Sequence, residues 1–138
     1  MAKQQFLKQY QIFLIKAKED FAAAKYLYNG FKNDEIDLNI SIICFHLQQS
    51  VEKTLKATLD YYNIKFPHSH DIEDLLNIIT DNNITLIDNV RNLERLTDYA
   101  VDWRYSIIHD DIKDSEKYFT LINELIDFVT KMLEGTVQ

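Results

Sequence analysis

An arginine and a histidine, Arg104 and His109, lie five positions apart in the stretch DWRYSIIHDD at residues 102–111. A guanidinium stays charged, and its fork of N–H donors matches the oxygens of a phosphate. An imidazole titrates at about pH 6.5, so it can take up or return a proton near neutral pH. The pair could therefore bind and cut a phosphate ester. The same stretch could also be only a boundary between two helices.

The spacing of these two residues limits how they could meet. Five positions on a continuous helix turn a side chain by about 500°, which leaves the two side chains about 140° apart. They converge only if the helix ends or bends between them, or if a second subunit contributes one of them. Asp110 and Asp111 follow His109 directly, which is compatible with a helix end. They would repel a phosphate unless they face away from it.

The elements that would position these residues are predicted to be helices. Apolar residues recur at steps of three and four, which indicates five amphipathic helices at about residues 4–28, 35–62, 71–80, 86–103 and 114–135. Gly30 is expected to end the first, Asn33 or Asp34 to cap the second, and a capping box at Thr85–Asp88 to begin the fourth. Short connections predict antiparallel neighbours. The fold class is therefore all-α, an up-and-down bundle of four or five helices in one domain over residues 1–138.

The composition agrees with long helices and limits the function. The sequence has 2 Gly and 1 Pro in 138 residues, 46% hydrophobic residues and a net charge of −7. This charge argues against non-specific coating of nucleic acid, but it leaves room for a small basic site. No apolar run reaches membrane-spanning length, so a cytoplasmic protein without membrane contact is expected. Cys44 lies in an apolar pattern, which favours a core residue over a nucleophile.

The second helix carries a polar row formed by Gln48, Glu52 and Lys56 at steps of four. The row reads most simply as a solvated face with one Glu52–Lys56 ion pair, since glutamate four residues before lysine is the favourable order. Arg104 suggests a second role for this row. Its helical spacing turns it toward the core, where a charge needs a partner, and Glu52 is the natural candidate.

Five stretches of the chain resemble one family in the right order. They are KAKEDFAAAKYL at 16–27, His46-x-Gln48-Gln49-x-x-Glu52-Lys53-x-x-Lys56-Ala57, PHSHDI at 67–72, Thr97-Asp98-Tyr99, and Arg104-Tyr105. Together they are similar to HEPN domains, the small helical domains named for nucleotide binding in higher eukaryotes and prokaryotes. The resemblance implies a helical bundle like that of nucleotidyltransferase substrate-binding subunits, and it covers nearly the whole chain.

The resemblance also implies an activity and partners. Many HEPN domains are metal-independent endoribonucleases with an Arg, four to six residues, then a His. By this likeness Arg104 and His109 are the catalytic pair, with Glu52, Lys56 and Tyr105 supporting them or binding phosphate. No metal and no cofactor are implied. The expected partners are a second copy of the chain, a separate small nucleotidyltransferase, and RNA or a nucleotide.

Two functions are compatible with these residues. The protein could be the ribonuclease toxin of a HEPN–nucleotidyltransferase toxin–antitoxin pair. It could instead be a non-catalytic module that docks a nucleotidyltransferase or a nucleotide, with Arg104 and Glu52 only tying two helices together. Tyr105 follows the arginine where the catalytic motif often has Asn, Asp or His, and Ser106 replaces the usual proline. A metal site at His68, His70 and Asp71 is the least favoured alternative, since no second ligand pair accompanies it.

Overall fold

Five helical segments form the part of the chain that the computed structural model describes, residues 6–98 and 112–135, with side chains from residue 115 in the second range. They are α1 (Gln9–Lys32), α2 (Ile40–Tyr61), α3 (Ile72–Asp81), the 3₁₀-helix η1 (Val90–Thr97) and α6 (Ile112–Leu133). No strand occurs within these residues. The all-helical fold class is therefore confirmed.

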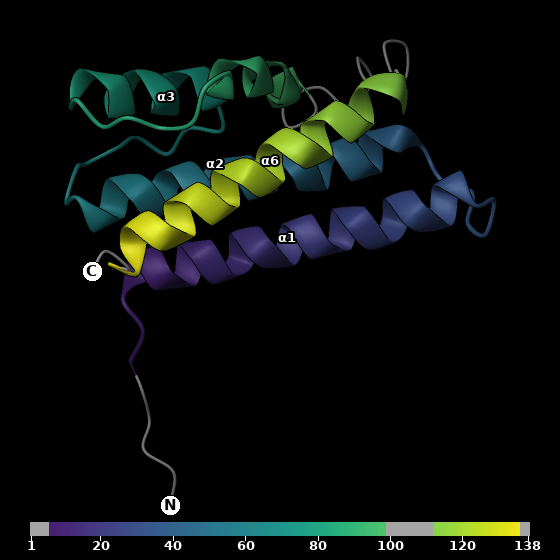
Figure 1. Ribbon diagram of the computed structural model, residues 1–138, viewed down its shortest axis with the longest axis horizontal. Helices are drawn as coiled ribbons and strands as arrows, with labels where there is room; N and C mark the ends of the chain where they lie inside the picture. The colour runs from purple at the N-terminus through teal and green to yellow at the C-terminus, as the bar shows by residue number, and fades with distance from the viewer. Residues whose placement is uncertain (1–5, 99–111, 136–138) are drawn as a thin grey trace, which may run out of the picture.

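Helix α2 is the centre of the bundle. Helix α1 packs antiparallel along α2, α6 lies across both, and α3 and η1 cover another side of α2 (Figure 1). Lys32 pairs with Glu116 at one end of α1, and Tyr10 and Leu133 line one pocket at the other end, so α6 is antiparallel to α1. Helices α2 and α6 therefore run in the same direction, with α3 and η1 carrying the chain between them.

The burial of α2 explains its central place. Its apolar stripe is fully buried, with Ile43, Leu47, Val51, Leu55 and Leu59 at 0% exposure. Two alanines of α1, Ala17 and Ala24, are also completely buried. Such small residues let the two helix backbones approach closely. The hydroxyl of Ser50 donates a hydrogen bond of 2.8 Å to the carbonyl oxygen of Ala17 across this contact.

Asparagine and aspartate, more than glycine, turn the chain between helices. Asp34, Asn63, Asn83 and Asn89 all have a positive φ, between 57° and 66°. These side chains tolerate the left-handed conformation better than other residues do. Gly135 takes the same conformation after α6. The chain can therefore make sharp turns with only 2 glycines.

The predicted boundary between the first two helices is wrong. Gly30 does not end α1, which continues to Lys32. A Cβ atom at Gly30 would lie 3.0 Å from the side chain of Ile36, so glycine leaves room for the close approach of Ile36 after the turn. The cap of α2 is Asn39, whose side chain accepts a hydrogen bond of 2.8 Å from the N–H of Ser41. Residues 33–39 thus form the connection.

The start of the fourth helix also differs from its prediction. No helix begins at the capping box of Thr85, because Asn89 takes a left-handed conformation that interrupts any helix entering from residue 86. The segment that follows is a 3₁₀-helix, and its buried residues Leu93 and Leu96 have the three-residue spacing of that geometry. The predicted continuation to Trp103 lies outside the described residues.

The third helix matches its prediction closely. Asp71 caps it, with its carboxylate accepting a hydrogen bond of 2.9 Å from the N–H of Glu73. The buried residues are Ile72, Leu75, Leu76 and Ile79, whose spacing of three and four places them on one face of the helix. This cap fixes the point at which the chain returns from the turn after α2 to the surface of α2.

Candidate functional site

The structure describes two of the five predicted site residues, Glu52 and Lys56, both on α2. Arg104, Tyr105 and His109 lie outside the described residues. The described part of the site consists of the polar side chains around Glu52 and the ends of the two elements that flank residues 99–111.

Glu52 is a buried carboxylate, with 4% of the residue exposed. Lys56 donates a hydrogen bond of 2.8 Å from Nζ to Oε2 of Glu52, which confirms the predicted ion pair. Gln48 donates from Nε2 to Oε1 of the same carboxylate at 3.1 Å. Gln48 has no exposed surface and Lys56 has only 9%. The interpretation of this row as a solvated face is therefore wrong, because α3 and the chain before it cover it.

His70 completes this cluster from outside α2. Its Nδ1 lies 3.1 Å from Oε1 of Glu52, and its carbonyl oxygen accepts a hydrogen bond of 2.9 Å from Nε2 of Gln48. An ionised carboxylate can only accept, so Nδ1–H of His70 is the donor of this hydrogen bond and Oε1 of Glu52 is the acceptor. The imidazole itself is 64% exposed. We name Gln48, Glu52, Lys56 and His70 the Glu52 cluster.

The sequence alone does not assign His70 to this cluster. Its position beside Asp71 suggests a helix cap, but Asp71 alone has that role. The contact from His70 to Glu52 spans a turn and 18 positions. Helical spacing gives no sign of it. The sequence offers two signals, the place of His70 in the family-like stretch PHSHDI and its position directly before a helix that packs on the polar row.

Glu52 is held in its ionised form. Burial raises the pKa of this carboxyl, but hydrogen bonds from Lys56, His70 and Gln48 favour the charged form more strongly, and the net pKa is lowered from 4.5. A carboxylate has about four acceptor positions, two on each oxygen. Oε1 accepts from two groups and Oε2 from one. One position on Oε2 therefore has no partner among the described residues.

The Glu52 cluster adjoins the chain that leads to Arg104. The hydroxyl of Thr97 accepts a hydrogen bond of 3.1 Å from the N–H of Ile72, the first residue of α3. This bond ties the end of η1 to the start of α3, two residues after His70. Helix α6 begins at Ile112, directly after the segment 99–111. Arg104 and His109 therefore belong to a connection that starts beside the cluster.

A second polar cluster lies between α1 and α2. Asp20 of α1 receives a hydrogen bond of 2.6 Å from Nζ of Lys53 and lies 3.1 Å from Nδ1 of His46. We name these three residues the Asp20 cluster. In the sequence, Lys53 and His46 stand out only as part of the family pattern. The structure shows that they attach α1 to α2.

Neither a metal centre nor a membrane span is found in the described residues. No group of three or more histidine, cysteine, aspartate or glutamate side chains in residues 6–98 and 115–135 has an arrangement suited to a metal ion. Asp71 is engaged as a helix cap and His70 with Glu52. Over the same described residues, no helix combines the length and the apolarity needed to cross a membrane.

Comparison with known proteins gives one match. The family model described as the HEPN domain matches residues 10–133, which is nearly the whole chain. No curated protein and no solved structure matches the chain significantly. The matched range includes all of α1 except its first residue, α2, α3, η1 and all of α6.

Proposed function

Because the chain belongs to the HEPN domain family, we propose that it is a metal-independent RNA endonuclease that acts as the toxin of a toxin–antitoxin pair with a small nucleotidyltransferase. One observation supports this proposal above the others. Glu52 is buried and ionised beside the chain that leads to Arg104, and its Oε2 has an acceptor position without a partner in the described residues. An arginine is the side chain that best fills such a position.

In the proposed site, Glu52 orients Arg104, and Arg104 binds the scissile phosphate. The 2′-oxygen of the RNA attacks phosphorus, a P–O2′ bond forms, and the P–O5′ bond breaks. The proton of the 2′-hydroxyl passes to a base, and a proton from an acid reaches the departing 5′-oxygen. The guanidinium stabilises the charge that builds up on the phosphate oxygens. The products are a 2′,3′-cyclic phosphate and a 5′-hydroxyl.

His109 supplies the acid–base group in this scheme. One histidine per chain gives a single such group, so a homodimer that places two copies of the segment at one cleft would supply both a base and an acid. Lys56 lies within the Glu52 cluster and would hold Glu52 in place. Tyr105 follows Arg104 directly and is the remaining candidate for contact with the phosphate.

A second function has its own support. Lys56 already neutralises Glu52 and His70 forms a hydrogen bond with it, so the cluster can hold α2 and α3 together without Arg104. In this alternative the protein is a non-catalytic HEPN module that docks a separate nucleotidyltransferase or binds a nucleotide. Both functions use the same fold, and they differ in whether His109 is required for any chemistry.

The test is cleavage of a labelled RNA by the purified protein in the presence of a chelator. The wild type is expected to leave 2′,3′-cyclic phosphate ends, and His109→Ala is expected to lower the rate by at least about a hundredfold. His68→Ala is the matched control, because His68 is exposed and makes no described polar contact. Growth of cells that express the wild type alone should slow, and His109→Ala should relieve this effect.

If wild type and His109→Ala are equally inert, and neither slows growth, the endonuclease is excluded and the docking module remains. Retention of a co-expressed nucleotidyltransferase by both proteins would then support that alternative. If cleavage persists in His109→Ala at the wild-type rate, the activity belongs to another site or to a contaminating ribonuclease.

A further inference from the structure

The distribution of arginine along the chain is uneven. Only three arginines occur in the sequence, Arg91, Arg95 and Arg104, and all lie within residues 91–104. The other 12 of its 15 basic residues are lysines, spread from residue 3 to residue 131. Arginine binds phosphate through a planar fork of donors, whereas lysine offers a compact point charge. The chain therefore places its best phosphate-binding side chains in one short region.

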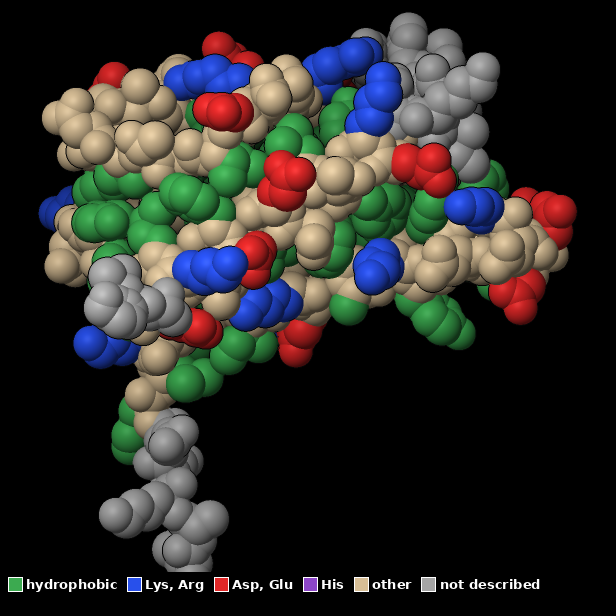
Figure 2. Space-filling model, viewed as in Figure 1, with side chains coloured by type: hydrophobic (Ala, Val, Ile, Leu, Met, Phe, Trp, Pro, Cys, Tyr) green, Lys and Arg blue, Asp and Glu red, His purple; other side chains and the backbone are tan. Residues whose placement is uncertain are grey.

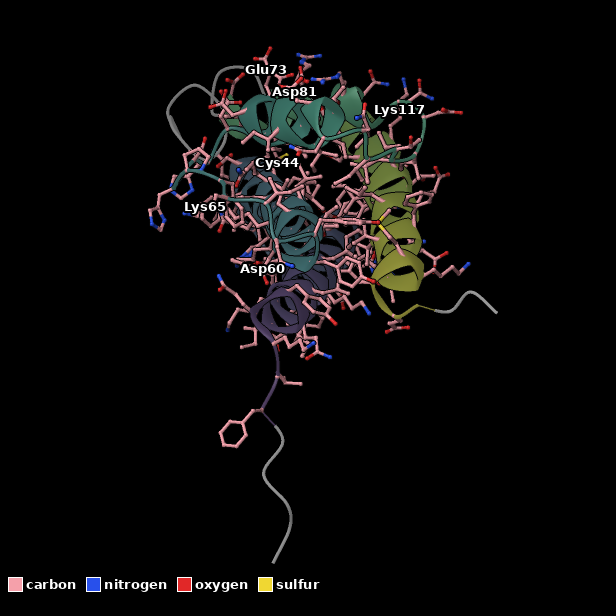
Figure 3. All side chains as sticks on the ribbon, turned by 90° about the vertical axis from the view of Figure 1, so that its left-hand side faces the viewer. Cys44, Asp60, Lys65, Glu73, Asp81 and Lys117 are labelled. Carbon is pink, nitrogen blue, oxygen red and sulfur yellow. The ribbon has the colours of Figure 1, made fainter. Side chains whose placement is uncertain are left out.

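The structure gathers the first two of these arginines in a groove. Arg91 and Arg95 of η1 line it on one side, and Lys117 and Tyr118 of α6 line it on the other. The groove has a volume of about 410 Å³. Figure 2 shows that Lys and Arg side chains gather where η1 ends and α6 begins, and Figure 3 places Lys117 on the outer surface at the start of α6. We name this the η1–α6 groove.

The charges of this groove are available for a ligand. Arg91 is anchored, since it donates at 2.8 Å to Glu94 and at 3.2 Å to the hydroxyl of Thr80, but these bonds use two of its five N–H donors. Arg95 and Lys117 are exposed, and their side chains have no hydrogen-bond or ion-pair partner in the described ranges. Three cations thus face one carboxylate, that of Glu94, on a chain whose net charge is −7.

A second pocket also has basic side chains in its lining, but one of them is already paired with a carboxylate. Lys25 and Lys32 line a pocket of about 570 Å³ between α1 and α6. There Lys32 is paired with Glu116 at 3.3 Å, and no arginine takes part. An anion would have to compete with Glu116 for Lys32. In the η1–α6 groove, an anion would not have to displace a carboxylate from Arg95 or Lys117.

The place of the groove in the chain connects it to the proposed chemistry. Arg95 lies two residues before the end of η1, and Lys117 lies five residues after the start of α6. The segment that carries Arg104 joins these same two elements. The groove therefore lies between the two elements that this segment connects.

We propose that the η1–α6 groove binds the phosphate backbone of single-stranded RNA and guides it to the segment 99–111. This inference rests on the proposed endonuclease for its purpose, but the binding can be tested separately. Arg95 and Lys117 bind phosphates, and Arg91 is held in position by Glu94. Asn92 adds a polar side chain to the same lining.

The experiment measures binding of a short fluorescent single-stranded RNA by full-length protein that also carries His109→Ala, so that the RNA stays intact. Arg95→Gln with Lys117→Gln is expected to weaken binding about tenfold. A plot of log affinity against log salt concentration has a negative slope. This slope should become shallower by about 0.7 for each phosphate that the protein no longer neutralises. Lys16→Gln with Lys65→Gln is the matched control, because both lysines are exposed and the net charge changes equally.

Equal weakening by both pairs of substitutions would overturn the inference, since total charge would then explain binding. No weakening by the groove pair would also overturn it. Competition with polyglutamate separates RNA from an acidic protein partner. If polyglutamate displaces the RNA as effectively per charge as unlabelled RNA does, the groove is not an RNA site.

Two results distinguish the inference from the proposed function. If cleavage depends on His109, while the groove pair binds RNA like its parent and also cuts RNA like the wild type when His109 is retained, only the inference fails. If no His109-dependent cleavage occurs but the groove pair loses RNA binding, the inference stands and the endonuclease fails. Thermal unfolding followed by circular dichroism would verify that both pairs of variants remain folded.

Discussion

Helix α2 takes part in two polar clusters, each with a carboxylate, a lysine and a histidine, in two different environments. In the Asp20 cluster, a carboxylate from α1 meets Lys53 and His46 of α2. In the Glu52 cluster, a carboxylate of α2 meets Lys56 of the same helix and His70 from the chain before α3. The carboxylate side chain is 16% exposed in the first cluster and 5% exposed in the second. The lysine side chains follow the same order, at 25% and 11%.

This difference in burial indicates different roles. The Asp20 cluster lies at the edge of the α1–α2 contact, where water can replace a missing partner. The Glu52 cluster lies under the start of α3, where removal of one partner leaves the other charge without solvation. A fourth residue, Gln48, is buried with Glu52 and bonds to both Glu52 and His70. The more buried cluster is also the one next to the chain that carries Arg104.

The largest expected effect is that of Glu52→Ala. This change leaves the ammonium of Lys56 largely buried without its carboxylate, and we expect the free energy of unfolding to fall by about 3 kcal/mol. Urea denaturation followed by circular dichroism measures it. Asp60→Ala is a matched control on the same helix, and Asp60, labelled in Figure 3, makes no side-chain hydrogen bond in the described residues. If Glu52→Ala lowers the free energy of unfolding by less than Asp60→Ala does, Lys56 reaches water and the cluster is only weakly buried.

A smaller effect is expected for Asp20→Ala. Lys53 and His46 keep 25% and 30% of their side-chain surface exposed, so both can be solvated after the change. We expect a loss of about 1 kcal/mol in the free energy of unfolding, measured by the same denaturation. If this variant is as unstable as Glu52→Ala, the two clusters do not differ in their contribution to stability. The attachment of α1 through Asp20 then stabilises the fold as much as the buried carboxylate does.

The smallest effect is expected from pH. The pKa of Glu52 is lowered, because its hydrogen bonds outweigh the effect of burial that would raise it. A carboxyl with a lowered folded-state pKa contributes stability above its ordinary value of 4.5, and this contribution is lost as the pH falls from 4.5 through the folded-state pKa. The difference in unfolding free energy between wild type and Glu52→Gln should therefore be constant above pH 4.5 and shrink below it.

Urea denaturation of both proteins across this range measures that difference. A difference that grows on acidification would mean that burial dominates and that the carboxyl is neutral in the folded protein. Glu52 would then be unable to hold an arginine through an ionic contact, and the proposed role toward Arg104 would lose its basis.

Helical periodicity predicted most of the fold because it depends on neighbours along the chain. The four buried residues of α3 and its cap Asp71 follow from local spacing alone. The boundaries that failed depend on tertiary contact or on the choice of a left-handed residue. Gly30 leaves room for the close approach of Ile36 and does not end a helix, and the left-handed Asn89 interrupts the helix that the capping box at Thr85–Asp88 would favour.

The site was predictable only in part for the same reason. The pairing of Glu52 with Lys56 is a local event at a spacing of four, and the sequence predicted it. Whether that pair faces water or lies buried depends on α3, which packs over it from a later part of the chain. The contacts of His70 and of Asp20 are likewise tertiary. The family resemblance placed these residues in a motif, but it did not say what they touch.

The burial of α2 has a consequence for how this protein can be altered. Of its 22 residues, 14 are buried, and these include six polar side chains that lie within hydrogen-bonded surroundings. Few positions on this helix can accept a new side chain without a cost in stability, so random mutagenesis should recover few functional changes there. Changes in ligand preference would come more easily at exposed positions such as Arg95 and Lys117, where a substitution disturbs no packing. Helix α2 would then determine the fold, while exposed positions of the η1–α6 groove could change without loss of stability.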